Sequence, residues 1–334
     1  MLSIKDIARI AGVSVSTVSR VMNNKPSVKA DKRERVLRVI EETGFVPNRA
    51  ARDIVLKQTS KVGILLPDTF NQFQRQLFSE VAHNVESYGY YTNFIFISSE
   101  DSGEEEVLHK LKSERLDGIV QLKEIELPEF CTYVEQQEIP VIHLTFEIEN
   151  FMWPTHIHIS DRLGAKEATN YLISLGHSDI AFIVGRKFSF GTHREQGYKE
   201  ALQEHGIRYN QDLTSYVDSY TMREGKRATE ALLQRNIPFS ALFATSDDLA
   251  IGAIRQLIES GLNVPEDVSV IGVDNIEFSE YTDPSLTTIE QPIKEMGKLA
   301  VELLHKRIIG KEEPTMRNIV IPYTLIERES TKRK

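Results

Sequence analysis

One short stretch near the N-terminus, Ser14 to Asn23, carries hydroxyl, amide and guanidinium side chains and no acidic residue. Arg20 can donate two parallel hydrogen bonds to O6 and N7 of guanine, and Val15 can contact a thymine methyl group. Ser16 can pair with several bases and therefore specifies weakly. The remaining polar residues suit phosphate contacts or support, which set register rather than sequence: Ser14, Thr17, Ser19 and Asn23. The stretch thus predicts DNA recognition; the alternative is a solvated helix face.

The segment around this stretch has the spacing of three short helices. Apolar residues recur at helical intervals in three runs: Ile4, Ile7, Ala8 and Ala11; Val18, Val21 and Met22; Val36, Leu37 and Ile40. Gly12 suits the end of the first helix, Val13 a buried turn position, and Ser14 an N-cap. We expect the third helix within Asp31–Glu42, closing at Thr43-Gly44. Three helices around one apolar cluster form a helix-turn-helix module.

Charge separates this segment from the rest of the chain. Residues 1–60 hold 12 Lys and Arg against 6 Asp and Glu, whereas residues 61–334 hold 28 against 43. Local field rather than total charge guides encounters with polyanions, so the N-terminal segment alone is predicted to have a polyanionic partner.

From residue 61 the chain alternates strand-like and helix-like runs. The strand candidates include Lys61–Pro67, Tyr91–Ile97, Gly118–Gln121, Pro140–Thr145, Ile180–Val184, Ser240–Ala244 and Val268–Val273. The helix candidates include Leu77–Ser87, Glu104–Glu114, Arg162–Ser174, Glu195–His205, Arg223–Gln234 and Asp248–Ser260. Such alternation favours parallel sheets covered by helices on both faces. There are enough strands for two α/β subdomains, with a break near residues 150–160.

Several side chains at the ends of these strands could bind a sugar-like ligand. Ligands of open parallel sheets bind beyond the C-terminal strand ends. Arg194 and Asp274 offer planar bidentate partners for vicinal hydroxyls, and Phe73 and Tyr220 offer aromatic faces. The alternatives stay open: a surface ion pair for Arg194, a turn cap for Asp274, and ordinary core positions for the two aromatic residues.

The run Ile4–Asn23, followed by Gly44–Arg52, resembles the lactose-repressor family of bacterial transcription regulators (the LacI/GalR type). The similarity extends over nearly the whole chain. It implies that residues 45–60 form a hinge helix that folds when two copies meet in the minor groove of DNA. Asn48 is then a support residue, and Ala51 and Ile54 are the minor-groove residues.

The resemblance also implies a body like that of periplasmic sugar-binding proteins. The expected fold is an all-α helix-turn-helix domain followed by two doubly wound parallel-sheet subdomains. The implied ranges are 1–44 for the DNA-binding domain, 45–60 for the hinge, 61–157 with 291–320 for the first subdomain, and 158–290 with 321–330 for the second. The implied effector-binding residues are Asn71, Phe73, Arg194, Tyr220, Ser246 and Asp274.

Three positions depart from the family pattern. Lys29 stands where a Ser usually caps the third helix; Ser27 or Asp31 could contribute instead. Ile54-Val55 replaces the usual Leu and small residue, and this β-branched pair is stiffer and less helix-prone. Ser246 stands where sugar binders often have Asn, so the pattern of hydroxyl recognition is open.

Other signals exclude several classes of protein. Cys131 is the only cysteine, no signal segment is apparent, and no apolar run is long enough to cross a membrane. We therefore expect a cytoplasmic protein. His156 and His158 alternate on an expected strand, but no third metal ligand is evident, so we predict no metal site and no cofactor. Catalytic and nucleotide-binding motifs are absent, which argues against an enzyme. We expect the tail Thr331–Lys334 to be frayed.

We therefore predict a homodimeric, sequence-specific transcription regulator, a repressor, that binds a near-palindromic operator. Its effector is predicted to be a sugar or a sugar phosphate; Arg186 and Lys187 keep the phosphate option open. One alternative is a body that docks a phosphorylated carrier protein, which the acidic Asp283 disfavours because such relatives have a basic residue there. A cytoplasmic sugar receptor and a sugar-processing enzyme are the alternatives of another class.

Overall fold

The computed structural model describes residues 2–22, 27–45, 59–68, 70–97, 103–123, 128–144, 155–185, 189–312 and 317–334. The chain forms two units, Met1–Ser60 and Lys61–Lys334, which we call the N-terminal unit and the body. Four predicted site residues lie outside the described ranges: Asn23, Asn48, Ala51 and Ile54. Arg186, Lys187 and most of the predicted hinge also lie outside them. No described helix is long and apolar enough to cross a membrane.

The N-terminal unit contains three helices: α1 (Ile4–Ala11), α2 (Val15–Met22) and α3 (Ala30–Thr43). Ser3 and Asp6 form a capping box at the start of α1, and Gly12 ends that helix in the left-handed region, at φ 62°. One apolar cluster joins the helices: Ile7, Ala8, Ala11, Val18, Val21, Val36, Val39 and Phe45. This arrangement confirms the predicted helix-turn-helix.

Helix α3 differs from the prediction at Leu37, and its N-cap residue is Lys29. Leu37 was expected in the core but is 50% exposed, and Val39 is buried instead. Leu37 follows Val36 directly, so its side chain points about 100° around the helix, away from the cluster that Val36, Val39 and Ile40 contact. Lys29 occupies the N-cap position and forms no side-chain capping bond. Its carbonyl oxygen accepts the N–H groups of Lys32 and Arg33.

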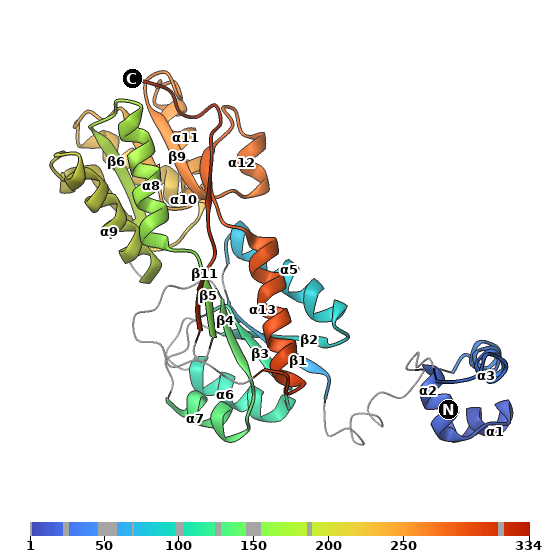
Figure 1. Ribbon diagram of the computed structural model, residues 1–334. Helices are drawn as coiled ribbons and strands as arrows, with labels where there is room; N and C mark the ends of the chain where they lie inside the picture. Colours follow the sequence, from blue (N-terminus) through green and yellow to red (C-terminus); the bar gives the residue numbers. More distant parts are fainter. Residues whose placement is uncertain are drawn as a thin grey trace. The chain divides into compact units, whose positions relative to one another are not determined.

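The body is built on two six-stranded sheets (Figure 1). Sheet A has the order β11-β5-β4-β3-β1-β2, and all its pairs are parallel. Its strands are β1 (Lys61–Pro67), β2 (Tyr91–Ile97), β3 (Gly118–Gln121), β4 (Val141–Leu144), β5 (Thr155–His158) and β11 (Arg317–Val320). Helices on its two faces are α5 (Gln72–Ser87) with α13 (Ile293–Ile308), and α6 (Gly103–Glu114) with α7 (Pro128–Gln136).

Sheet B has the order β12-β10-β9-β8-β6-β7, with only β12 antiparallel among its described pairs. Its strands are β6 (Ile180–Gly185), β7 (Thr214–Val217), β8 (Ala241–Ala244), β9 (Ser269–Asp274), β10 (Thr287–Glu290) and β12 (Thr324–Ile326). Its helices are α8 (Asp161–Ser174), α9 (Ser189–Glu204), α10 (Met222–Gln234), α11 (Asp247–Glu259) and α12 (Glu277–Tyr281), with a 3₁₀ turn at Gln211–Leu213.

The chain passes between the sheets three times: after β5, after β10 and after β11 (Figure 1). Each sheet has helices on both faces, which confirms the predicted pair of doubly wound subdomains. The strand and helix boundaries differ from the predicted ones mostly by one to a few residues. Sequence analysis did not name α7, α12 or α13 among its helices, and it did not name the short strands β7, β10, β11 and β12.

Helices α10 and α11 approach so closely that two glycines are required. A Cβ at Gly225 would lie 2.1 Å from the Leu249 carbonyl oxygen, and one at Gly252 would lie 2.0 Å from that of Met222. This packing holds the N-terminus of α11 against sheet B, where Ser246 and Asp247 begin the helix.

The expectation of a frayed C-terminal tail was wrong. The Lys334 N–H donates to the Leu175 carbonyl oxygen at 2.9 Å, and the Lys332 N–H donates to Ser269 Oγ at 3.0 Å. Tyr171 and Thr331 share a hydrogen bond at 3.0 Å. These bonds tie the polar tail to α8 and sheet B, which its composition alone did not indicate.

Candidate functional site

The predicted base-reading residues share the exposed side of α2. Val15 is 41% exposed, Ser16 and Arg20 are exposed, and Val18 and Val21 are buried on the opposite side. The helix contains no acidic residue that would repel phosphate. The structure therefore brings Val15, Ser16 and Arg20 together on one surface.

Hydroxyl groups gather at the N-terminus of α2. Ser14 Oγ accepts the Thr17 N–H at 3.2 Å, as an N-cap does. It also lies 2.8 Å from Ser16 Oγ and 2.9 Å from Thr17 Oγ1. Ser19 is half-buried and has a partner within the protein. An anion at this helix end would meet donors already held in place by the cap.

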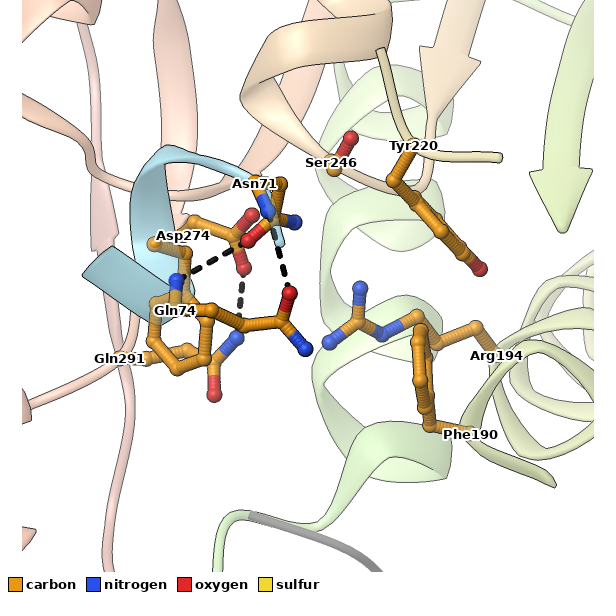
Figure 2. A pocket seen from close by; sticks show the side chains of 9 residues that line it. Asn71, Gln74, Phe190, Arg194, Tyr220, Ser246, Asp274 and Gln291 are labelled. Atoms are coloured by element: carbon orange, nitrogen blue, oxygen red, sulfur yellow. Dashed lines mark hydrogen bonds between the residues drawn. The ribbon is translucent and has the colours of Figure 1, made fainter. Parts of the chain in front are cut away.

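A pocket in the body lies between the C-terminal ends of the strands of the two sheets (Figure 2). Its lining contains all six residues predicted for effector binding: Asn71, Phe73, Arg194, Tyr220, Ser246 and Asp274. Sequence analysis missed three further lining residues: Gln74, Phe190 and Gln291. Gln74 and Phe190 lie on the same helices as predicted residues, and Gln291 follows β10, which was not recognised as a strand.

Arg194 is held in the pocket by a buried ion pair. Its Nε donates to Asp161 Oδ1 at 2.8 Å, and its Nη1 donates to the Thr245 carbonyl oxygen. Burial lowers the pKa of Arg194, but Asp161 and Asp274 raise it, and the net shift is upward. The side chain is 6% exposed, so the alternative of a surface ion pair was wrong. Its guanidinium lies 5.1 Å from the centre of the Phe190 ring and points across the pocket (Figure 2).

Asp274 lies at the end of β9 in an uncommon backbone conformation. Its φ is 121°, a region that non-glycine residues adopt only where the surroundings impose it. Gln291 Nε2 donates to Asp274 Oδ1 at 2.6 Å. Burial raises the pKa of Asp274 well above its ordinary value, although Arg194 acts in the opposite direction. One oxygen of this buried carboxyl group is thus already engaged by Gln291.

Aromatic side chains and helix N-caps complete the lining. Tyr220 accepts the Gly185 N–H at 3.2 Å, and its ring lies 5.2 Å from that of Phe190. Burial raises the pKa of Tyr220 to about 12, so its hydroxyl is neutral. Ser246 caps α11 and Asn71 caps α5, so each has a side-chain oxygen engaged at a helix N-terminus. The pocket thus combines amide, carboxyl and guanidinium groups with aromatic faces, which suits a ligand carrying hydroxyls on an apolar ring.

The histidines noted on β5 are packed within sheet A. His156 and His158 stack with ring centres 4.4 Å apart, and His143 on β4 lies 5.2 Å from His156. His158 hydrogen-bonds the Ile159 carbonyl oxygen at 2.6 Å and Asn318 at 2.8 Å. Within the described residues, no group of three His, Cys, Asp or Glu side chains has a geometry that could hold a metal ion.

Comparisons with known proteins agree with this architecture. The model of the lacI family of bacterial regulatory proteins matches residues 3–48, and that of periplasmic binding protein-like domains matches residues 169–331. The transcriptional regulator RegA of Clostridium saccharobutylicum is 35% identical over 98% of this chain and 99% of its own.

Two solved structures resemble nearly the whole chain. A complex of the transcriptional regulator CelR with cellobiose is 30% identical, with a TM-score of 0.74, and covers 99% of this chain and 100% of its own. The lac repressor dimer bound to operator and the anti-inducer ONPF is 26% identical, with a TM-score of 0.85, over 99% of both chains. The named relatives are transcription regulators and not enzymes. From the helix-turn-helix, the two-sheet body and these similarities, we conclude that the chain belongs to the lacI family of bacterial regulatory proteins.

Proposed function

We propose that this regulator is a repressor whose affinity for its operator is controlled by a sugar or sugar phosphate bound in the body. The observation that carries the proposal is the convergence of all six predicted effector residues on one pocket. These residues come from strand ends of both sheets, so a bound ligand would contact both and favour their closed arrangement.

The DNA-binding half of the proposal rests on α2. Arg20 would read guanine in the major groove, with Val15 and Ser16 beside it, while Ser14, Thr17 and Ser19 support phosphate contacts. Asn23, Asn48, Ala51 and Ile54 belong to the same proposal, the last two as minor-groove residues of the hinge. Two copies of the chain would bind the half-sites of a near-palindromic operator.

One similar structure supports the proposed operator binding, and another supports the proposed effector binding. The lac repressor structure shows a dimer on its operator, and the CelR structure shows a regulator with a disaccharide. We further propose the subdomain ranges 61–157 with 291–320, and 158–290 with 321–330.

If the effector changes the affinity for the operator by some factor, the operator changes the affinity for the effector by the same factor.

A thermal-shift screen of neutral sugars and sugar phosphates tests the effector. A ligand of the pocket raises the melting temperature of the parent protein, and Asp274→Ala abolishes that rise. A compound that stabilises both proteins equally binds elsewhere, and a complete panel without any shift contradicts a sugar effector.

Operator titrations at increasing salt test the DNA-binding half. For ~6–10 phosphate contacts, affinity should fall by ~10³–10⁵ between about 50 and 200 mM salt. Adding the identified sugar should shift the operator affinity, and a shift of zero would contradict the proposed coupling.

A further inference from the structure

A hydrogen bond next to the pocket joins a helix that packs on sheet A to a helix that packs on sheet B. Neither of its two residues lines the pocket. The N–H of Gln72, the first residue of α5, donates to Asp248 Oδ2 on α11 at 3.2 Å, across 176 residues of sequence. Helix α5 packs on sheet A and α11 packs on sheet B. A carboxylate from one subdomain therefore satisfies a first-turn N–H group of a helix from the other.

The position of this bond relates it to the pocket. Gln72 stands between Asn71 and Phe73, and Gln74 follows; all three neighbours line the pocket. On the other side, Asp248 is two residues from Ser246, which also lines it. The contact thus ties together the two helix N-termini that form facing parts of the lining.

Asp248 is held in a buried position between the two subdomains. Burial raises the pKa of its carboxyl group; the Gln72 N–H and Arg75 act in the opposite direction, and the net shift is upward. The residue is 6% exposed, and the positive end of the α5 dipole favours a negative charge at this point. Within α5, Asn71 already accepts the Gln74 N–H, so Asp248 serves a donor that the local capping box does not.

Apolar contacts reinforce the same junction. Ile251, one turn further along α11, packs against the cores of both sheets. Ile276, which follows β9 of sheet B, is 1% exposed and belongs to the core cluster of sheet A. Separation of the subdomains would break the Asp248 bond and expose both isoleucines.

We propose that Asp248 is a positioning residue for the effector pocket: it caps α5 across the subdomain boundary and holds the two subdomains in the arrangement in which the lining converges. Only the expected effect of Asp248 on effector affinity rests on the proposed function. The capping of α5 by Asp248 can be tested without a ligand. Loss of the acceptor should loosen α5 and shift the subdomains toward separation.

The experiment uses the full-length protein and three variants. Asp248→Ala removes the acceptor, and Asp248→Asn keeps an uncharged one. Asp267→Ala is the matched control, because Asp267 accepts the Asn263 N–H at 2.7 Å within sheet B's own subdomain.

Hydrogen exchange measured by mass spectrometry follows the amides of α5. In Asp248→Ala we expect exchange of its first turn to rise about fivefold, which corresponds to a typical cap loss of ~1 kcal/mol. Asp248→Asn should be intermediate, and Asp267→Ala should match the parent there.

A second measurement reports the arrangement directly. Spin labels at Gln137→Cys and Arg208→Cys, both exposed, lie one on each subdomain, in a Cys131→Ser background. Asp248→Ala should add longer distances to the distribution, and it should lower the affinity for the sugar found in the thermal-shift screen by about fivefold. Unchanged α5 exchange and unchanged distances in Asp248→Ala would overturn the proposal. If no sugar binds the parent, the effector assignment fails, but exchange and distances still decide the role of Asp248.

Discussion

At the residue scale, Arg194 shows why this pocket has a defined shape before any ligand enters. Its guanidinium is fixed by Asp161, by the Thr245 carbonyl oxygen and by the face of Phe190. Each of these contacts uses a different edge or face of the planar group, which lysine cannot reproduce. A ligand therefore meets a guanidinium with its orientation already set, and little side-chain entropy remains to be lost on binding.

The pair of Arg194 and Asp161 should also contribute to stability. Arg194→Met leaves the Asp161 carboxylate, 2% exposed, without its cation, so we expect the free energy of unfolding to fall by ~3–5 kcal/mol. Adding Asp161→Asn should recover ~1–3 kcal/mol, because the uncompensated charge is then removed. Urea denaturation of the two single variants and the double variant measures the coupling. Strictly additive losses would mean that the two residues act independently.

Arg20 allows a matching prediction for the N-terminal unit. Arg20→Ala should weaken operator binding by ~1–3 kcal/mol and relax selectivity at one base position. Fluorescence anisotropy with single-base operator variants measures both effects. Arg38→Ala is the control, since Arg38 is an exposed α3 residue paired with Glu34 at 3.1 Å. Equal weakening on all operators would instead identify Arg20 as a phosphate contact.

At the element scale, hydrophobic periodicity predicted most helices and strands, and the positions of strand ends predicted where the pocket residues lie. The alternating runs identified both sheets, and the strand-end rule indicated Asp274, which lines the pocket; Ser246, which the family resemblance implied, lines it too. Local patterns could not reveal the partner of Arg194, because Asp161 is 33 residues away in sequence. Gln291 was missed because β10 is a short strand with a weak apolar signal. The φ of Asp274 depends on the surrounding fold, which no local pattern encodes.

Sheet A also carries a row of buried polar side chains across four strands. Gln121 on β3 is in register with His143 on β4, which is in register with His156 on β5, and His156 is in register with Asn318 on β11. Burial, together with the neighbouring histidines, lowers the pKa of His143 to about 3 and that of His156 to about 2. Both rings are therefore neutral in the folded protein at pH 7.

This row predicts a specific pH dependence of stability. Below a pH of about 6.5, the unfolded chain binds protons at these histidines and the folded chain does not, so their contribution to stability falls until the folded pKa values are reached. Replacing both by Gln should reduce the loss between pH 7.5 and 5.5 by ~2–3 kcal/mol relative to the parent. Asp247 and Asp274 act in the opposite direction because their folded pKa values are raised. Comparing parent and variant by urea denaturation cancels that contribution; an equal loss in both would contradict the prediction.

At the scale of the whole molecule, charge and exposed apolar surface point to different partners. The N-terminal unit is basic and the remainder is acidic, so attraction to DNA is confined to the unit that carries α2. The body instead exposes aromatic residues on β2, an edge strand of sheet A: Tyr91, Phe94 and Phe96, at 45%, 47% and 49%. Phe94 and Phe96 are two residues apart and therefore share one face of the strand. Neighbouring exposed apolar side chains on a sheet edge are a common place for association with another chain.

We expect this edge to contribute to association of two copies. The double variant Phe94→Ser/Phe96→Ser should shift sedimentation from dimer toward monomer, because the apolar area buried between copies is lost. Leu163→Ser is the control: it removes an apolar side chain that is 53% exposed on α8, in the other subdomain. That variant should sediment as the parent does.

Loss of the dimer should then reduce operator binding without any change at α2. Two linked half-sites are bound with a gain of ~10²–10⁴ over one, because the second contact is intramolecular. Phe94→Ser/Phe96→Ser should therefore bind a full operator about as weakly as the parent binds an isolated half-site. If the variant sediments as a monomer but keeps full operator affinity, two-fold recognition is wrong and a single copy suffices. If it remains a dimer, the dimer contacts lie on another surface and the edge of β2 has no part in them.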